Sequence, residues 1–500
     1  MERPVPKRSS SSQANVAKKS DPPAKAPAID PEAERRVRKK IDLMIMPIIC
    51  ILYLFCFIDR ANIGNARLAG LEKDLGMKGY DYNATLSVFY ISYILCEIPS
   101  NVLCKLVGPG WFLPILTILF GSCSLANGFV KTVPQAMAVR FLLGIFEAGM
   151  FPGIAYYLSR WYRRSELTFR LACYVTASPL AGAFGALLAS AILTMDSIGG
   201  SIHRWRMIFV IEGLVTIGLG IIGLVILTDS PATARWLTPD EKELAESRVR
   251  SERVGQSKVL DKIDKVKLIK GVTSPVTISL AAMFFFVNIT VQGFSVFAPT
   301  IIGTLFSEKT TIQKQLLTAP PYLLGSIFTL VLPFLSWRMD TRQIFMILGA
   351  PTGIIGYIIF LATDKDDATV RYFATFLIAS AVSSYGAFCS GQASANVVSD
   401  TARSSAIGFM VMVGNLGGLV STWSFLPMDA PNYPIGNGLN LASQASILAI
   451  AVGMMFWMKR DNRRRDERHE EAEAEAKLRE MSKSEIEDLD WQHPYFRWQI

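Results

Sequence analysis

The sequence predicts an all-α membrane protein with twelve transmembrane helices in two six-helix halves, and three observations support that prediction. The chain is 51% apolar and only 19% charged, and its apolar residues gather in separate blocks. Each block is roughly 20 residues long, the length that crosses a hydrocarbon core about 30 Å thick. Short basic segments separate the blocks, and one long polar stretch, 229–275, divides them six and six. A soluble multidomain protein is excluded, because it would show shorter, periodic apolar stripes.

Composition divides the chain into five regions. Residues 1–40 are rich in Ser, Pro, Ala, Lys and Arg and hold no apolar run, which predicts a disordered cytosolic tail and no cleavable signal peptide. The first six-helix half follows at 41–228 and the cytosolic middle loop at 229–275. The second half occupies 276–458, and a cytosolic C-terminal tail occupies 459–500.

The spans follow the apolar blocks in order. We expect them at about 43–63, 83–105, 111–129, 134–157, 169–194, 206–228, 276–302, 316–337, 342–362, 370–392, 403–427 and 439–458. Pro and Gly interrupt two of them. Span 8 holds Pro320, Pro321, Gly325 and Pro333, and span 11 holds Gly408, Gly414, Gly417, Gly418 and Pro427. Within the middle loop, the run from Thr238 to Glu241 has the form of a capping box with Pro at the first helical position, which predicts a surface helix there.

Lys and Arg decide the orientation of the spans. They cluster before span 1 and after spans 4, 8 and 12, which all face one side if the spans alternate, whereas the opposite loops carry only scattered bases such as Lys131 and Lys365. Both termini are therefore predicted to be cytosolic. The formal charge of +9 reflects this asymmetry, and we expect no nucleic-acid partner.

The residues that commonly hold cofactors give no such pattern. The seven cysteines lie in or beside apolar blocks, which favours buried thiols over a disulfide framework. The three histidines are widely separated and no Walker motif occurs, so an ATP-driven pump and a metalloenzyme are unsupported and no cofactor is expected. Small-residue runs such as Gly144–Gly153 and Gly414–Gly418 indicate close helix packing. The sequon at Asn83 lies so close to span 2 that we do not expect it to be glycosylated.

Ionisable residues inside the spans point to function, because each costs roughly 2.5–3.5 kcal/mol on insertion scales. Span 1 contains Asp59 and Arg60, which point roughly 100° apart, and span 4 contains Arg140 and Glu147 on one helix face. The functional interpretation gives the arginines an anionic substrate and the carboxylates a proton. The alternative is an ion-pair cluster that ties span 1 to span 4.

Two further carboxylates lie nearer the ends of their spans, Glu97 of span 2 and Glu212 of span 6, and for these a structural role is favoured. The interiors of spans 7–12 hold essentially no formal charge. Neutral hydrogen-bonding groups occur there instead, and we take most of them as substrate-binding candidates: Asn288, Gln292, Tyr322, Tyr385 and Asn415, with Gln392 as a further polar residue.

Several stretches resemble the anion:cation symporter family of the major facilitator superfamily, whose six-plus-six arrangement matches the predicted topology. They are Phe57–Gly64, Glu97–Asn101, Arg140–Gly153 and Arg204–Gly213, and Tyr495–Trp498 is similar to the tail of the fungal allantoate permease branch. The resemblance runs from about residue 35 to 500, and the span 4 motif is its most specific part. The loop after span 2 lacks the Asp-Arg-x-Gly-Arg pattern common across the superfamily.

The resemblance implies roles for individual residues. In members of that family an arginine of span 1 and one of span 4 bind the anion, which implies substrate binding by Arg60 and Arg140. A glutamate two turns further along span 4 takes part in coupling, which implies the same for Glu147, and Asp59 matches a proton-coupling aspartate. Asn415 resembles a polar residue of span 11.

We therefore expect a proton-coupled symporter that imports a small organic anion by alternating access. Substrates of the fungal branch include allantoate, nicotinate, pantothenate and biotin, and the aromatic content of the second half favours an aromatic carboxylate over a sugar acid. We expect a monomer in the lipid bilayer of the plasma membrane. An exporter of an acidic metabolite and a nutrient receptor without flux are the alternatives. The ordinary length of the tails and middle loop argues against the receptor.

Overall fold

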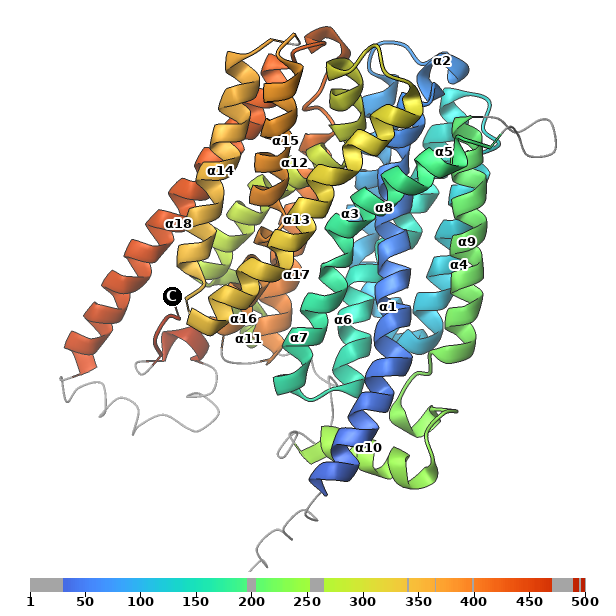
Figure 1. Ribbon diagram of the computed structural model, residues 1–500. Helices are drawn as coiled ribbons and strands as arrows, with labels where there is room; N and C mark the ends of the chain where they lie inside the picture. The colour runs from blue at the N-terminus through green and yellow to red at the C-terminus, as the bar shows by residue number, and fades with distance from the viewer. Residues whose placement is uncertain are drawn as a thin grey trace, which may run out of the picture.

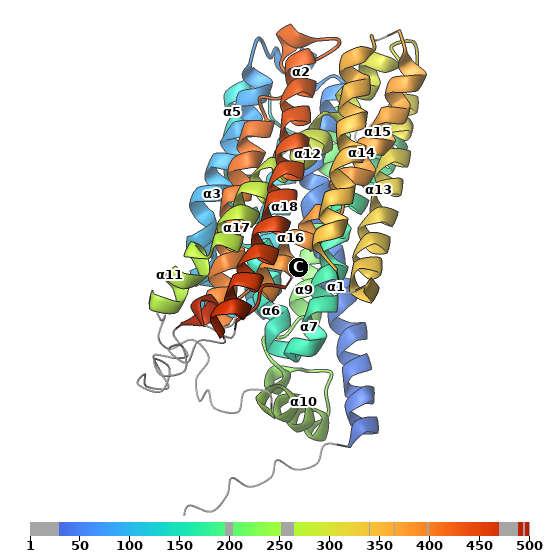
Figure 2. The ribbon, with the colours of Figure 1, turned by 90° about the vertical axis from the view of Figure 1, so that its left-hand side faces the viewer.

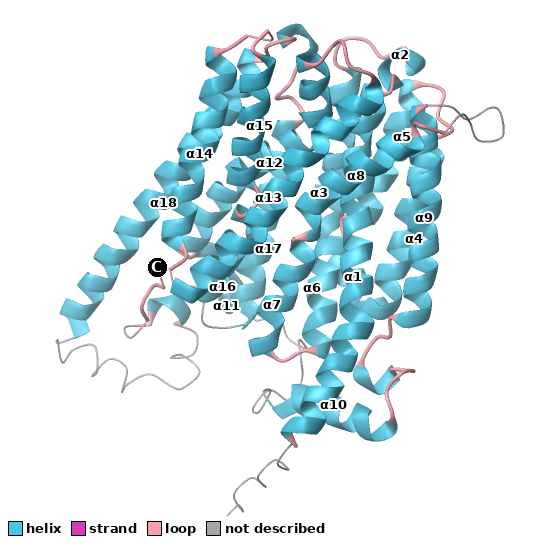
Figure 3. Ribbon diagram, viewed as in Figure 1, coloured by secondary structure: helices cyan, strands magenta, loops and turns pink. Residues whose placement is uncertain are grey.

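The computed structural model describes residues 30–195, 204–251, 265–339, 341–364, 366–397, 400–469, 489–493 and 496–499. Every regular element in these ranges is a helix, and Figure 3 shows a bundle of long helices without a strand. Within them, eleven helices are long and apolar enough to cross a membrane, and Ser405–Ser421 forms a shorter apolar helix. The predicted all-α architecture of about twelve spans is confirmed.

The helices follow the predicted order. The first half contains α1 (Pro31–Leu68), α2 (Leu71–Leu75), α3 (Asp81–Val107), α4 (Pro109–Asn127), α5 (Val133–Glu147), α6 (Met150–Trp161), α7 (Arg164–Val175), α8 (Ala177–Ile192) and α9 (Trp205–Ile226). The middle loop contains η1 (Pro231–Thr233), α10 (Pro239–Ser251) and α11 (Lys265–Thr273). The second half contains α12 (Pro275–Leu305), α13 (Thr311–Met339), α14 (Gln343–Ala362), α15 (Ala368–Val382), α16 (Tyr385–Ala395), α17 (Asp400–Ser421), η2 (Pro427–Asp429) and α18 (Pro434–His469), and η3 (Asp490–Gln492) follows.

The helices run side by side between two ends of the bundle (Figure 1). One end carries α2, and we call it the α2 end. The other carries α10, the start of α1 and the last described residues of the chain, and we call it the α10 end. Figure 2 shows α17 of the second half beside α3 of the first, and these two helices contact each other directly.

The first helix begins earlier than the sequence analysis expected. We assigned residues 31–40 to the disordered tail, whereas α1 already starts at Pro31 behind Asp30, whose side chain accepts a hydrogen bond from the backbone of Glu32. Lys40 Nζ lies 2.6 Å from Glu241 Oε2 on α10. Val37 of this segment is buried, and α10 supplies a partner surface for the added turns. Residues 1–29 lie outside the described part.

The middle-loop helix starts where the capping box predicted. Thr238 N donates to Glu241 Oε2 at 2.9 Å, and Glu241 N donates back to Thr238 Oγ1 at 3.3 Å. The hydrogen bonds from Lys40 and from Thr238 lower the pKa of the Glu241 carboxyl. This lowering contributes stability above the carboxyl's ordinary pKa, and the contribution is lost as the pH falls through the lowered value.

Helix interruptions fall in other places than Pro and Gly suggested. Span 8 is continuous as α13 through its prolines, so the expected interruption there is wrong. Pro321 lacks the N–H that would bond Leu317 O, and the hydroxyl of Tyr372 donates to that carbonyl instead, at 2.9 Å. Span 11 ends as α17 at Ser421, so residues 422–427 of the predicted span are not in it. Spans 4, 5 and 10 each divide into two helices.

The last described residues dock against the α10 end of the second half. Trp498 is buried, and its Nε1 donates to Asp461 Oδ2 of α18 at 2.7 Å. Its backbone N–H and carbonyl both bond the side chain of Asn462. Gln499 N donates to Asn396 Oδ1 of α16 at 2.8 Å. This part of the predicted tail is therefore tied to two transmembrane helices.

At the α2 end, α3 contacts the segment after α17. Asn83 Nδ2 donates to Thr422 O at 2.6 Å, and Ser87 Oγ lies 2.8 Å from Thr422 Oγ1. Trp423 Nε1 also donates to Ser87 Oγ. The two halves are thus joined at this end, and the sequon residue Asn83 is buried with its amide engaged.

Candidate functional site

Four charged side chains of the first half are buried in the middle of the bundle. Asp59, Arg60, Arg140 and Glu147 are between 0% and 7% exposed. They come from α1 and α5, the helices that sequence analysis named. Since an unpaired charge in such surroundings is costly, the partners of each group decide what it can do.

Arg60 and Glu147 form the ion pair at the centre. Arg60 Nη2 and Nε donate to Glu147 Oε2 at 2.9 and 3.1 Å. The other oxygen of Glu147, Oε1, is buried and has no hydrogen-bond partner among the described residues. The Cys56 thiol also interacts with this carboxyl. One carboxylate oxygen is therefore bonded to Arg60, and the other bonds no cation.

Aromatic rings surround the Arg60 guanidinium. Its central carbon lies 4.8 Å from the ring centroid of Phe57, 5.2 Å from that of Phe89 and 5.0 Å from that of Tyr93. Cations bind favourably to the faces of such rings. The sequence analysis missed Phe89 and Tyr93, although their spacing of four residues in span 2 places them on one helix face.

Glycines bring α5 and α6 close to α3 at this point. A Cβ added to Gly144 would lie 2.3 Å from Phe89 O, and one added to Gly149 would lie 2.2 Å from Ser100 Oγ. The backbone at Phe89 leaves no room for a side chain at position 144. The small-residue run of span 4 therefore allows close helix packing here, as the packing interpretation predicted.

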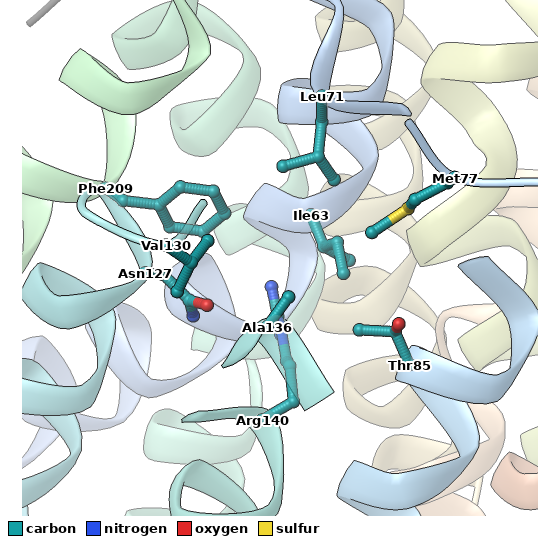
Figure 4. A pocket seen from close by; sticks show the side chains of 9 residues that line it. All are labelled: Ile63, Leu71, Met77, Thr85, Asn127, Val130, Ala136, Arg140 and Phe209. Carbon is teal, nitrogen blue, oxygen red and sulfur yellow. The ribbon is translucent and has the colours of Figure 1, made fainter. Parts of the chain in front are cut away.

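Arg140 is the unpaired cation of the cluster. It is 2% exposed, its Nη2 has no hydrogen-bond partner, and no salt bridge joins it to a carboxylate in the part of the chain that the structure describes. Its side chain points into a small cavity toward the α2 end, as Figure 4 shows. The cavity holds about one water molecule and is lined by Ile63, Leu71, Met77, Thr85, Asn127, Val130, Ala136, Arg140 and Phe209.

Asp59 faces away from Arg60. Ser124 Oγ of α4 donates to Asp59 Oδ1 at 2.8 Å, and Thr216 Oγ1 of α9 donates to Asp59 Oδ2 at 3.2 Å. The two adjacent charged residues of α1 thus contact different helices. Arg60 meets α3 and α5, and Asp59 lies inside the first half against α4 and α9.

Asn415 of the second half contacts Glu97, a carboxyl of the first half that interacts with Arg60. Asn415 Nδ2 of α17 donates to Glu97 Oε2 of α3 at 2.9 Å. The contact joins the two halves in the bilayer interior, so Glu97 links them in the state described.

Three of the other polar candidates of the second half, Asn288, Tyr322 and Tyr385, donate to backbone carbonyls. Asn288 Nδ2 donates to Phe284 O of its own helix, and Gln292 is buried on the same helix. The Tyr322 hydroxyl donates to Phe294 O at 3.0 Å, and its ring packs against Gly182 of α8. The Tyr385 hydroxyl donates to Met346 O inside the core of the second half, so the structure does not bring Tyr385 to the charged cluster.

Arg371 is a buried charge at the start of predicted span 10, outside the span interiors that are expected to hold essentially no formal charge. It lies in α15 and is only 2% exposed. It donates to Phe360 O, to Thr363 and to Asn432 Oδ1. These acceptors join the α2 end of α14 to the segment before α18, which is a structural arrangement. Arg371 is the second residue of predicted span 10, and sequence analysis overlooked this charge.

Metal binding has no geometric support in the described ranges, where no group of three or more His, Cys, Asp or Glu side chains is placed to hold an ion.

Comparison with known proteins gives consistent matches. Residues 49–422 match the model of the Major Facilitator Superfamily. An uncharacterised transporter of Schizosaccharomyces pombe is 33% identical over 440 residues, covering 88% of this chain and 85% of the relative. The high-affinity nicotinic acid transporter of Saccharomyces cerevisiae is 30% identical over 429 residues, covering 86% and 79%. A bacterial homologue of the human lysosomal transporter Spinster, solved inward-facing and unoccupied, superposes with a TM-score of 0.63 at 15% identity and covers 85% of this chain and 96% of that one.

Proposed function

This chain belongs to the major facilitator superfamily, and from that premise we propose that it is a proton-coupled symporter of a small organic anion. The superfamily assignment makes it a secondary transporter and not an enzyme. The anionic cargo and the coupling to protons are the parts of the proposal that the charged cluster supports.

The observation that carries the proposal is Arg140. A buried guanidinium that no carboxylate bonds directly is costly in a bilayer-spanning helix, and an anionic ligand offsets that cost when it binds. Its planar fork matches a carboxylate in two hydrogen bonds. The cavity at its tip is too small for such a ligand in the present state. We infer that substrate reaches Arg140 when the halves move apart at the α2 end.

Coupling is assigned to Glu147 and Arg60. While Glu147 is ionised, it holds Arg60 and keeps that guanidinium from the substrate. A proton on Glu147 weakens the pair and frees Arg60 to meet the incoming carboxylate. Proton and anion then enter together, and the empty site returns after both have left it.

An aromatic carboxylate fits the surroundings of the two arginines. Phe57, Phe89 and Tyr93 surround Arg60, and the Phe209 ring centroid lies 5.9 Å from the Arg140 guanidinium carbon. Rings of this kind stack on an aromatic ligand and leave the carboxylate to the cations. The nicotinic acid transporter among the relatives supports the same class.

The proposal assigns the α10 end to the cytosol, because the basic segments gather there. The joined α2 end is then the outer one, and the described state is closed to the outside. We also propose the plasma membrane and a monomer, in which the two halves rock about the charged cluster.

The experiment is uptake of radiolabelled nicotinate, a sugar acid and a neutral amide of nicotinate into cells that produce the protein, at acid and at neutral external pH. We expect uptake of at least one of the carboxylates and no uptake of the amide. Uptake of the carboxylate should be faster at acid than at neutral external pH. Equal uptake of acid and amide, or equal rates at both pH values for every acid transported, would contradict it.

A further inference from the structure

Glu212 is a buried carboxyl that the proposed function does not use. It lies on α9, is 0% exposed, and neither of its carboxyl oxygens has a hydrogen-bond partner among the described residues. A carboxylate ion left without partner in an apolar interior pays a large desolvation cost, and a neutral carboxylic acid pays far less. The surroundings of Glu212 therefore favour the protonated acid.

Asp59 faces the same region of α9. Thr216, which donates to Asp59 Oδ2, lies one helical turn from Glu212 on α9. Residues four apart share a helix face, so Glu212 lies on the face of α9 that contacts Asp59. Asp59 is the titratable group within electrostatic reach of Glu212.

Among the described residues, another charged group lies against α9: the Arg140 guanidinium carbon is 5.9 Å from the ring centroid of Phe209. The described residues of α8 contain no titratable side chain. On α4, the groups near Asp59 are Ser124 and Cys123. Arg140 and Glu147 of α5 also interact with Asp59. Asp59 is thus the member of the pair that interacts with the carboxylate and the guanidinium of the central cluster.

We propose that Glu212 and Asp59 form one proton-binding pair between α1, α4 and α9, with Glu212 the protonated member in this state. Two hydroxyls hydrogen-bond Asp59, one on each oxygen, which suits an ionised carboxylate. No hydroxyl among the described residues bonds Glu212, which suits a protonated, uncharged carboxyl. Two carboxyls whose surroundings differ in this way divide the roles of proton donor and acceptor.

The transport role of this pair rests on the proposed proton coupling. When Ser124 and Thr216 shift with their helices, Asp59 loses its hydroxyl donors. The proton on the Glu212 carboxyl can then pass to the Asp59 carboxylate, leaving Glu212 ionised and the charge of the pair unchanged. Glu212 lies nearer the α2 end, so the transfer moves the proton toward the central cluster.

Infrared difference spectroscopy tests the pair without knowledge of the substrate. The full-length protein in lipid nanodiscs is titrated with base, and the carbonyl band of buried, protonated carboxyl groups is followed. We expect a band at neutral pH that is absent in Glu212→Gln and present in the control Glu241→Gln, which removes a carboxylate outside the bilayer. An unchanged band in Glu212→Gln would overturn the proposal.

A second variant tests the coupling and does not depend on Glu212→Gln being folded. Asp59→Asn removes the neighbouring negative charge, so the band should disappear at a pH lower by about one unit or more. A band that titrates at the same pH in Asp59→Asn and wild type would refute the pair. If both infrared results hold but uptake of no acid depends on pH, the pair stands and the proposed symport fails.

Discussion

The guanidinium of Arg60 donates two hydrogen bonds, at 2.9 and 3.1 Å, to a single oxygen of Glu147. The geometry leaves the second oxygen of Glu147 buried and unbonded, although an arginine and a carboxylate can meet through two parallel bonds. A pair of this kind can be opened by one proton. It connects the helix that carries Asp59 with the helix that carries Arg140.

Replacing Arg140 should abolish anion binding. Arg140→Ala removes the cation that a buried carboxylate would meet, a loss of about 3–5 kcal/mol, or roughly 10²- to 10⁴-fold in affinity. Arg140→Lys should recover part of it, because lysine keeps the charge but lacks the planar fork. The measurement is equilibrium binding of the transported acid to purified protein.

The control for this prediction is Lys131→Ala, which removes the same charge from an exposed position near the start of α5. It should bind the acid as wild type does. Wild-type affinity in folded Arg140→Ala protein would remove Arg140 from the binding site.

The helical architecture could be predicted from the sequence because the length of each apolar block is a local property. In the hydrocarbon core, backbone N–H and C=O groups must bond within their own helix. Each apolar block therefore predicts one span, almost independently of the neighbouring blocks. The pairing of Asp59 with Ser124 and Thr216 was not accessible in this way. It depends on how α4 and α9 pack, and neither hydroxyl differs in sequence from many others.

The same reasoning explains two errors. Pro321 interrupts no helix because Tyr372, distant in sequence, supplies the missing donor to Leu317 O. Residues 31–40 are helical because α10 covers them, and composition alone gave no sign of that contact. Candidate residues chosen for polarity alone, such as Tyr385, were the least informative, since a single backbone carbonyl can satisfy them.

Breaking the contact between Asn415 and Glu97 should shift the balance between transport states. Asn415→Leu leaves a buried oxygen of Glu97 without its donor, at a cost of about 1–3 kcal/mol to the state described here. The outward-open state should gain population, measured as faster alkylation of a cysteine introduced at Thr85, which lines the Arg140 cavity. Alkylation at the wild-type rate would show that the contact does not hold the halves together.

Adding a methyl group at Gly64 should separate the halves at the α2 end. The Cβ of Gly64→Ala would lie 2.3 Å from the backbone oxygen of Val296 on α12, which cannot move as a flexible side chain does. We expect loss of uptake together with increased alkylation from outside. Gly218→Ala is the matched control, because its Cβ would meet nothing within 4 Å. Equal behaviour of the two variants would contradict the close contact.

Removing the Trp498 side chain should destabilise the second half. The indole is 3% exposed and packs against Trp457, Trp491 and Phe496. Truncation of a large buried aromatic costs about 3–5 kcal/mol, so Trp498→Ala should unfold at a clearly lower temperature. Trp111→Ala, at a tryptophan that is 48% exposed, should change the unfolding temperature far less. Equal shifts would mean that the docked residues do not stabilise the bundle.

The coupling role of Glu147 is the central claim, and Glu147→Gln tests it most directly. Glutamine imitates the protonated carboxyl, so Arg60 is released permanently while the anion site is kept. The measurement is uptake of the transported acid driven by an imposed pH gradient, set beside counterflow at equal pH on both sides of the membrane. We predict that Glu147→Gln retains counterflow and loses accumulation driven by the gradient. Undiminished accumulation in Glu147→Gln would contradict the account and leave Glu147 as a structural partner of Arg60.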